Sequence, residues 1–151
     1  MNAAADKGPT LKQRAIRHLA RREHTRAELQ RKLSPYGDHD EIDTVLNDLQ
    51  SAGLLSDARF AEAYVRSHGE RFGATRLRQS LRAKGVDAET VEARLAAADL
   101  PDELERARAL WARKFSAPPG DMKEWARQAR FLQSRGFPGD VIRRVLKNIE
   151  D

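Results

Sequence analysis

The chain contains 151 residues and no cysteine, and its 28 lysines and arginines against 23 aspartates and glutamates give a net charge of +5. The absence of cysteine excludes disulfides, thiolate nucleophiles and cysteine-ligated metal sites. The longest apolar runs have four residues, against about 20 needed to cross a membrane, and residues 1–9 lack the apolar segment of a secretory signal. We therefore expect a cytoplasmic protein without a membrane span.

The composition predicts a helical protein. Alanine, arginine and leucine dominate, with 23, 21 and 16 residues, whereas valine, isoleucine and threonine together number 15. The first three favour helices and the last three favour strands. With 40% apolar and 34% charged residues, the chain suits amphipathic helices around several small cores better than one large core.

Helix signals follow one another from Thr10 onward. Thr10 with Gln13, and Thr25 with Glu28, each form a capping box, which predicts that helices begin at these two sites. The second helix is predicted to end at the Ser-Pro-Tyr-Gly stretch that follows it. A third helix is predicted between residues 38 and 53, with apolar positions at Ile42, Val45, Leu46 and Leu49.

A sequence pattern then recurs at a constant offset of 51 residues. The pattern is a leucine, two further residues, a basic residue, a glycine and an apolar residue, and it occurs at residues 81–86 and 132–137. Two apolar positions follow each copy at the same spacing, and residues 33–46 carry a similar order with one residue fewer after the glycine. Repetition of this kind indicates stacked modules, each too small to be stable alone.

We predict an all-α fold of three tandem three-helix repeats, stacked into an elongated and curved solenoid-like array. The predicted modules are residues 10–55, 56–100 and 101–151, preceded by a flexible segment at residues 1–9. Residues 116–120 are predicted to form an ordinary loop between two helices, with a joint inside module three as the alternative. We expect a monomer.

Basic residues concentrate in the second helix of modules two and three and in the segments that lead to it. Two sets are predicted to share a helix face, namely Arg71 with Arg78 and Arg82, and Lys123 with Arg127 and Arg130. Such stripes attract phosphate or acidic protein surfaces. The alternative is that basic residues near the ends of helices only complement the helix dipole and maintain solubility.

No catalytic or metal-binding pattern is present in the sequence. There is no glycine-rich nucleotide loop, no nucleophile elbow and no zinc helix, and the four histidines lack ligand spacing. We expect neither an enzyme nor a cofactor or metal. The aromatic residues at helical spacing are assigned to the core, namely Phe60, Tyr64, Trp111, Phe115, Trp125 and Phe131. Tyr36 and Phe72 lie beside glycines and are assigned to the filling of turns.

Several segments resemble the RecX family of bacterial recombination regulators. They are GLLSDARFAEAYVR at residues 53–66, LRAKGV at residues 81–86 and RFLQSRGF at residues 130–137. RREHTRAEL at residues 21–29 resembles the opening module of that family. The spacing between these segments is more specific than any one of them. The likeness spans roughly residues 11–149 and is loosest in module three.

The resemblance implies a curved stack of three-helix repeats that binds the RecA recombinase and lies in the groove of its filament on DNA. It implies inhibition of the ATPase, strand-exchange and coprotease activities of RecA, and so a role in homologous recombination, DNA repair and the SOS response. Carried over by position, the candidates for the filament-facing surface are Arg66, Arg71, Arg76, Arg78, Arg82 and Lys84 in module two and Lys123, Arg127, Arg130 and Arg135 in module three.

Two other functions remain open from the residues alone. In the first, the second and third helices of a module act as a helix-turn-helix whose basic residues contact the phosphates of single- or double-stranded DNA. The acidic third helices of modules one and two argue against this function, because they would face phosphates with like charge. In the second, the repeats form an adaptor for some other protein.

Overall fold

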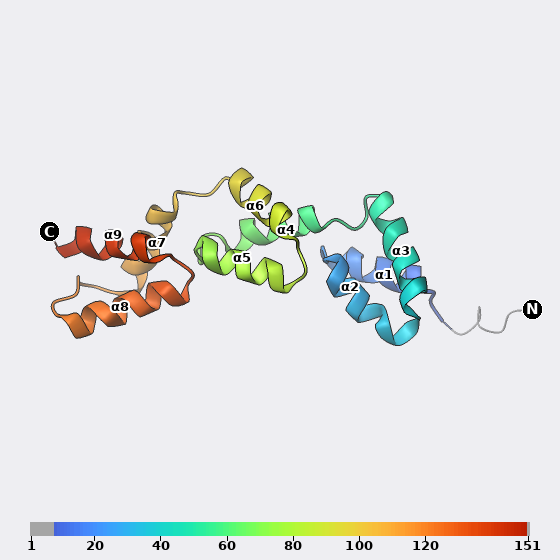
Figure 1. The fold of residues 1–151 in the computed structure, drawn as a ribbon, viewed down its shortest axis with the longest axis horizontal. Coiled ribbons are helices and arrows are strands. Elements are labelled where there is room, and N and C mark those ends of the chain that lie inside the picture. The colour runs from blue at the N-terminus through green and yellow to red at the C-terminus, as the bar shows by residue number, and fades with distance from the viewer. Residues whose placement is uncertain (1–7, 151) are drawn as a thin grey trace, which may run out of the picture.

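The computed structural model of the protein describes residues 8–150. In this part of the chain every regular element is a helix, as the composition predicts. The expected flexible segment at residues 1–9 lies outside the described residues except for Gly8 and Pro9. The described residues form nine α-helices, which Figure 1 shows as three groups in a row, and this confirms the predicted elongated array.

The helices follow the predicted order of three per module. Module one holds α1 (Leu11–Arg21), α2 (Arg26–Leu33) and α3 (His39–Ser51), with a 3-10 turn at Ser34–Tyr36. Module two holds α4 (Asp57–His68), α5 (Ala74–Ala83) and α6 (Ala88–Ala97). Module three holds α7 (Glu103–Lys114), α8 (Met122–Ser134) and α9 (Gly139–Glu150). The stretch at residues 116–120 is a loop between α7 and α8.

Both predicted capping boxes are formed. The Thr10 hydroxyl accepts a hydrogen bond from the Gln13 amide at 3.1 Å, and the Gln13 side chain accepts one from the Thr10 amide at 2.9 Å. Thr25 and Glu28 make the same reciprocal pair at the start of α2. These bonds satisfy backbone amides that the first turn of a helix leaves without partners, which is why the helices begin at these residues.

Each module has a hydrophobic core of its own. The core of module one includes Leu29, Leu33, Leu46 and Leu49, and that of module two includes Phe60, Val65, Leu81 and Val91. The core of module three includes Leu110, Leu132, Phe137 and Val145. Three separate clusters confirm the expectation of several small cores.

The glycines after α5 and α8 end these helices in the same way. Gly85 and Gly136 have φ angles of +94° and +91°, a left-handed conformation that residues with a Cβ rarely adopt. The next residue then bonds back to the last turn, Val86 to the Leu81 carbonyl at 3.1 Å and Phe137 to the Leu132 carbonyl at 3.2 Å. The glycine after α2 differs: Gly37 is extended, because the 3-10 turn already closes that helix.

The junction between modules one and two joins the start of α2 to the end of α5. The Thr25 hydroxyl donates a hydrogen bond to the Lys84 carbonyl oxygen at 2.7 Å. The Arg26 amide, the first of α2, donates to the carboxylate of Asp57, the first residue of α4, at 2.8 Å. An acid from the next module therefore satisfies a free amide of the helix before it.

The junction between modules two and three repeats this arrangement. The Gly73 amide donates to the Arg135 carbonyl oxygen at 2.7 Å, so that the start of α5 lies against the end of α8. The Ala74 amide, the first of α5, donates to the carboxylate of Glu103, the first residue of α7, at 2.7 Å. The repeat therefore extends from the modules to the contacts between them.

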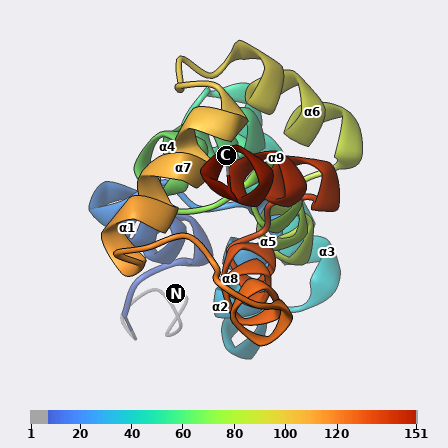
Figure 2. The same ribbon diagram turned by 90° about the vertical axis from the view of Figure 1, so that its left-hand side faces the viewer.

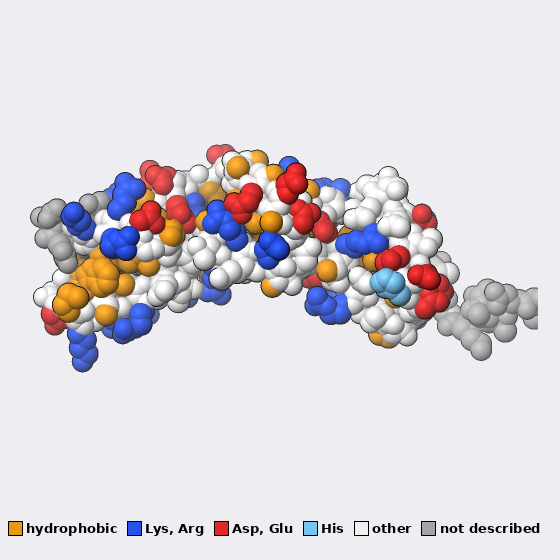
Figure 3. All heavy atoms as spheres, in the orientation of Figure 1, with side chains coloured by type: hydrophobic (Ala, Val, Ile, Leu, Met, Phe, Trp, Pro, Cys, Tyr) orange, Lys and Arg blue, Asp and Glu red, His pale blue; other side chains and the backbone are white. Residues whose placement is uncertain are grey.

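These junctions place α2, α5 and α8 head to tail along one side of the array. The three helices follow the lower side in Figure 1, and in the end-on view of Figure 2 α2 and α8 overlap in the lower part with α5 above them. Their dipoles point the same way, with the positive start of each helix against the negative end of the next. The lower edge of the molecule is arched, as Figure 3 shows.

Candidate partner-binding surface

The outer side of α8 carries a basic stripe, as its spacing predicts. Lys123, Arg127 and Arg130 are all exposed, and their spacing of four and three residues places them on one face. The buried residues Gln128 and Leu132 lie on the opposite face. Arg127 also binds both carboxylate oxygens of Glu124, at 2.8 and 2.9 Å. Lys123 and Arg130 form no ion pair within the described part of the chain.

On α5 only one of the predicted arginines is exposed without a carboxylate partner. Arg78 binds both carboxylate oxygens of Glu92 on α6, at 2.7 and 3.1 Å, and this guanidinium lowers the pKa of the Glu92 carboxyl. Arg82 is exposed and forms no ion pair within residues 8–147. Arg82 therefore keeps its whole charge available to a partner, whereas Arg78 is held against α6.

The structure corrects the predicted face of Arg71, Arg78 and Arg82. Arg71 lies in the turn before α5, which begins only at Ala74, so it cannot share a helix face with the other two. Its guanidinium lies 5.9 Å from the centre of the Phe72 ring. Spacing predicts a shared face only where both residues belong to one helix, and the glycine at residue 73 starts a new one.

Arg76 contributes to a junction between modules. Its guanidinium donates a hydrogen bond to the Ser134 carbonyl oxygen at the end of α8, at 2.9 Å, and lies 4.1 Å from the centre of the Phe72 ring. A cation near the negative end of a helix is stabilised by the helix dipole. Arg76 thus points toward module three, away from Arg78 and Arg82.

The remaining candidates lie near helix ends. Lys84 and Arg135 are the C-cap residues that directly follow α5 and α8. The Lys84 ammonium lies 5.9 Å from the centre of the Tyr64 ring, and the Arg135 guanidinium lies 4.8 Å from the centre of the Phe131 ring. Arg66, in the last turn of α4, forms an exposed ion pair with Glu62 at 3.6 Å. Exposed pairs of this kind contribute little to stability, so Arg66 can exchange Glu62 for another partner.

The exposed basic residues on the outer side of α2, α5 and α8 form what we call the helix-B surface. They are Arg31, Arg82, Lys123, Arg127 and Arg130. Arg78 and Lys32 are exposed too but are not included, because Arg78 is bound by Glu92 of α6 and Lys32 lines a groove beside α1. Figure 3 shows Lys and Arg side chains at intervals along the lower edge of the array, where these helices lie. Arg31 was not among the predicted residues, although it precedes Leu33 by two residues as Arg130 precedes Leu132. This match between the repeats is the sequence signal by which Arg31 could have been found.

Glu124 provides a pH test of the contact that holds Arg127. Side-chain hydrogen bonds from Arg127 and Gln128 lower the pKa of Glu124 to about 2. A depressed pKa in the folded protein means that the contact stabilises the fold above the ordinary pKa of glutamate and is lost as the pH falls through 2. Arg127→Gln should raise the pKa of Glu124 towards its ordinary value, as measured by carboxyl NMR titration. Arg130→Gln removes the same charge from the same face without a contact to Glu124, and should leave that pKa nearly unchanged.

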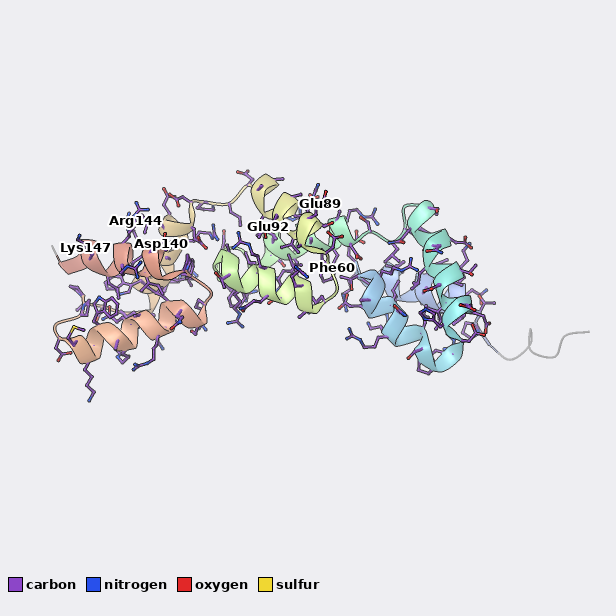
Figure 4. The ribbon with its side chains drawn as sticks, in the orientation of Figure 1. Phe60, Glu89, Glu92, Asp140, Arg144 and Lys147 are labelled. Atoms are coloured by element: carbon purple, nitrogen blue, oxygen red, sulfur yellow. The ribbon has the colours of Figure 1, made fainter. Side chains whose placement is uncertain are left out.

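The third helices differ in charge as the sequence indicates. Figure 4 shows Glu89 and Glu92 on α6 and Arg144 and Lys147 on α9. Both helices carry an acid in the first turn, Glu89 on α6 and Asp140 on α9. Beyond that turn α6 has Glu92, whereas α9 has Arg144 and Lys147. A recognition helix that enters a DNA groove must approach phosphates, so α6 is unsuited to that role and α9 alone has a compatible charge.

The aromatic residues lie where the sequence assigns them, with one exception. Phe60 and Phe115 are buried, and the others assigned to the core pack against it, namely Tyr64, Trp111, Trp125 and Phe131. The Trp111 indole donates to the side-chain oxygen of buried Gln128 at 2.7 Å. Tyr36 is the exception, because it is 54% exposed and does not fill its turn.

Neither a candidate metal site nor a candidate membrane span is found among the described residues. Among them, no three histidine, aspartate or glutamate side chains form a group that could hold a metal ion. No described helix is both long and apolar enough to cross a membrane. The site that the residues do build is an electrostatic surface.

Three family models match the chain in succession. They describe the first, second and third three-helix domains of RecX and match residues 12–49, 56–95 and 101–146. The chain belongs to the RecX family. The matches leave residues 50–55 and 96–100 unassigned, so the module boundaries at residues 55 and 100 stay a prediction.

RecX proteins of other bacteria are similar over nearly the whole chain. The regulatory protein RecX of Leptothrix cholodnii is 53% identical over 139 residues, which cover 91% of this chain and 88% of the relative. That of Chromobacterium violaceum is 46% identical over 143 residues, with 94% and 92% covered. The crystal structure of RecX from Lactobacillus salivarius superposes with a TM-score of 0.78 at 23% identity, covering 93% of this chain and 94% of that one. The structural likeness supports the fold, and the closer sequences support a regulatory protein.

Proposed function

We propose that this RecX-family protein is a negative regulator of RecA that binds in the groove of the RecA filament on DNA. It would inhibit the ATPase, strand-exchange and coprotease activities of RecA, and so modulate homologous recombination, DNA repair and the SOS response. The proposal assigns it no catalysis and describes a monomer that acts in the cytoplasm. The observation that carries it is the match to all three RecX domains.

The shape and charge of the array support this proposal. A filament is a long repeating partner, and an arched array of modules can contact several of its subunits at once. The helix-B surface extends over all three modules with basic residues on each. Several weak contacts on one chain combine through effective concentration, so strong binding needs no single strong contact.

Inhibition follows from binding without any chemical step by the regulator. A ligand that binds one state of an assembly more tightly than another shifts the population towards the state it prefers. A chain that spans neighbouring subunits in one arrangement opposes every change that alters their spacing. RecA activities that require the filament to pass between states would therefore slow together.

The first test is the ATPase activity of RecA on single-stranded DNA as this protein is added. We expect ATPase activity to fall at protein concentrations below that of RecA, while the same DNA without RecA stays largely unbound at those concentrations. Loss of activity only when the DNA itself is coated would contradict the proposal. That outcome would favour a protein that acts by binding DNA directly, of which the helix-turn-helix alternative with its basic α9 is one form.

A further inference from the structure

A second basic site lies in module one, away from α5 and α8. It is a surface groove of about 400 Å³ between α1 and the end of α2, which we call the α1 groove. Its lining residues are Arg14, Arg17, His18, Arg21, Lys32 and Tyr36. No acidic residue lines it, whereas Glu62 and Asp99 line the hollow beside α6 and Glu23 lines both hollows near the junction of modules one and two.

The cations of the α1 groove are not neutralised by the protein. Among the described residues, Arg14, Arg17, Arg21 and Lys32 take part in no ion pair. Another arginine of the same module does form an ion pair, namely Arg22 with Glu28. The three arginines follow one side of α1 at intervals of three and four residues, about one helical turn apart. The groove therefore presents a row of regularly spaced positive charges.

The histidines beside the groove indicate how positive it is. The Lys32 ammonium lies 2.9 Å from Nε2 of buried His24. An ammonium can only donate, so Nε2 accepts and the ring is neutral, with its other nitrogen donating to the Arg22 carbonyl oxygen at 3.1 Å. Burial, followed by the charges of Lys32, Arg21 and Arg22, lowers the pKa of His18. The neutral ring of His24, held against the Lys32 ammonium, and the lowered pKa of His18 both indicate that further positive charge is disfavoured here, so an anion would be favoured.

Tyr36 gives this groove a feature that favours nucleic acid over an acidic protein segment. The ring is 54% exposed, and the Arg14 guanidinium stacks on it at 3.7 Å from its centre. Proteins that bind single strands combine a cationic groove, which follows the phosphates, with exposed aromatic and arginine planes, on which bases stack. A run of glutamates could form ion pairs with the cations, but it has no planar group to stack on the Tyr36 ring.

We propose that the α1 groove binds the phosphate backbone of a single-stranded nucleic acid, with Tyr36 as a stacking surface for one of its bases. The site shares no residue with the helix-B surface, although Lys32 of the groove and Arg31 of that surface are neighbours on α2. Binding at this groove does not depend on the proposed action on RecA, because it involves this chain and the nucleic acid alone.

The test is binding of a fluorescent oligothymidylate to the full chain without RecA, followed by anisotropy between about 50 and 200 mM salt. Arg17→Glu with Arg21→Glu reverses two exposed charges of the groove. We expect this double variant to bind the oligothymidylate about tenfold more weakly or worse. The slope of log affinity against log salt concentration should become shallower by about 1.4, since each lost phosphate contact removes about 0.7.

Tyr36→Ala should weaken binding with little change in that slope, because it removes a stacking surface and no charge. Circular dichroism confirms that each variant is folded.

The matched control is Arg108→Glu with Arg113→Glu. Both residues are exposed on α7, and either double variant changes the net charge from +5 to +1. Equal losses in the two double variants would overturn the proposal, because they would show attraction by net charge alone. Equally tight binding of a polyglutamate peptide that is lost with the same two arginines would also overturn it, in favour of an acidic protein partner.

His18 supplies a readout at the groove itself. A phosphate beside the ring opposes the neighbouring positive charges, so the oligonucleotide should shift the imidazole NMR signals of His18 and raise its pKa. His39, which lies on α3 next to Asp43, should not shift. Shifts at His39 and not at His18 would overturn the site.

The variant with Arg17→Glu and Arg21→Glu should still inhibit RecA, which separates this proposal from the proposed regulation of RecA.

Discussion

Replacing Gly136 with alanine is expected to destabilise module three by about 3 kcal/mol. The residue has a φ of +91°, where a Cβ costs about 1 kcal/mol or more. An added Cβ would also overlap the backbone and Cβ of Arg76, at the start of α5. Backbone atoms cannot move aside as the end of a flexible side chain can, so the two helices would have to separate.

The fluorescence of tryptophan measures this effect in one module. The only two tryptophans of the chain, Trp111 and Trp125, both pack against the core of module three. Denaturant unfolding followed by tryptophan emission should therefore shift to lower concentrations in Gly136→Ala. Native-state hydrogen exchange should show module three opening separately from module two, because the contacts of Gly73 and Thr75 with residues 135 and 136 are lost.

Gly53→Ala is the matched control. Gly53 has a φ of +77° and ends α3 in a similar turn, but a Cβ there would meet no atom within 4 Å. Gly53→Ala should therefore destabilise module one only by the backbone cost of about 1 kcal/mol, measured by hydrogen exchange in that module. If the two substitutions cost the same, the close approach of α5 and α8 does not constrain Gly136, and the head-to-tail junction is weaker than its geometry indicates.

The sequence predicted the fold well because the signals that define it are local. A capping box such as Thr25 with Glu28 is complete within four residues, so its presence fixes where α2 begins whatever packs against it. The glycine turn recurs at an offset of 51 residues, so the repeated unit can likewise be recognised without knowing its contacts. Helix starts, module order and small cores all follow from such information.

The candidate surface was harder to predict because charge pairing depends on packing between helices. Arg78 and Arg82 look alike in sequence, yet Arg78 is held by Glu92, 14 residues away on α6, and Arg82 is not. Arg76 bonds to a carbonyl oxygen 58 residues away. Spacing along one helix says which residues share a face, but it does not say which of them meet a carboxylate on the next helix.

This difference decides which charges to reverse in a test of the partner surface. Changing Arg76, Arg78 and Arg82 together to glutamate is the direct test that the sequence suggests. In the structure that variant would break the contact of Arg76 with α8 and the ion pair of Arg78 with α6, so a loss of function would have two explanations. Arg82, Lys123 and Arg130 form no ion pair among the described residues and are all exposed.

The triple variant Arg82→Glu, Lys123→Glu and Arg130→Glu is therefore expected to lose inhibition of RecA while it keeps its fold. The concentration needed for half-inhibition of the RecA ATPase should rise by about 10- to 100-fold at low salt, because like charges placed against a complementary surface repel strongly. Helix content by circular dichroism and the unfolding midpoint should stay close to those of the unchanged protein. Oligothymidylate binding at the α1 groove should be much less affected.

The matched control reverses three exposed charges away from the helix-B surface, namely Lys12, Arg108 and Arg113. Both triple variants change the net charge from +5 to −1, so they differ only in where the reversed charges lie. A partner that senses net charge would respond to both alike, and the response would fade as salt screens the field. A partner that contacts the helix-B surface would respond to the first variant alone. Equal loss in the two variants would therefore contradict the surface, whereas loss confined to the first would place the partner along α5 and α8.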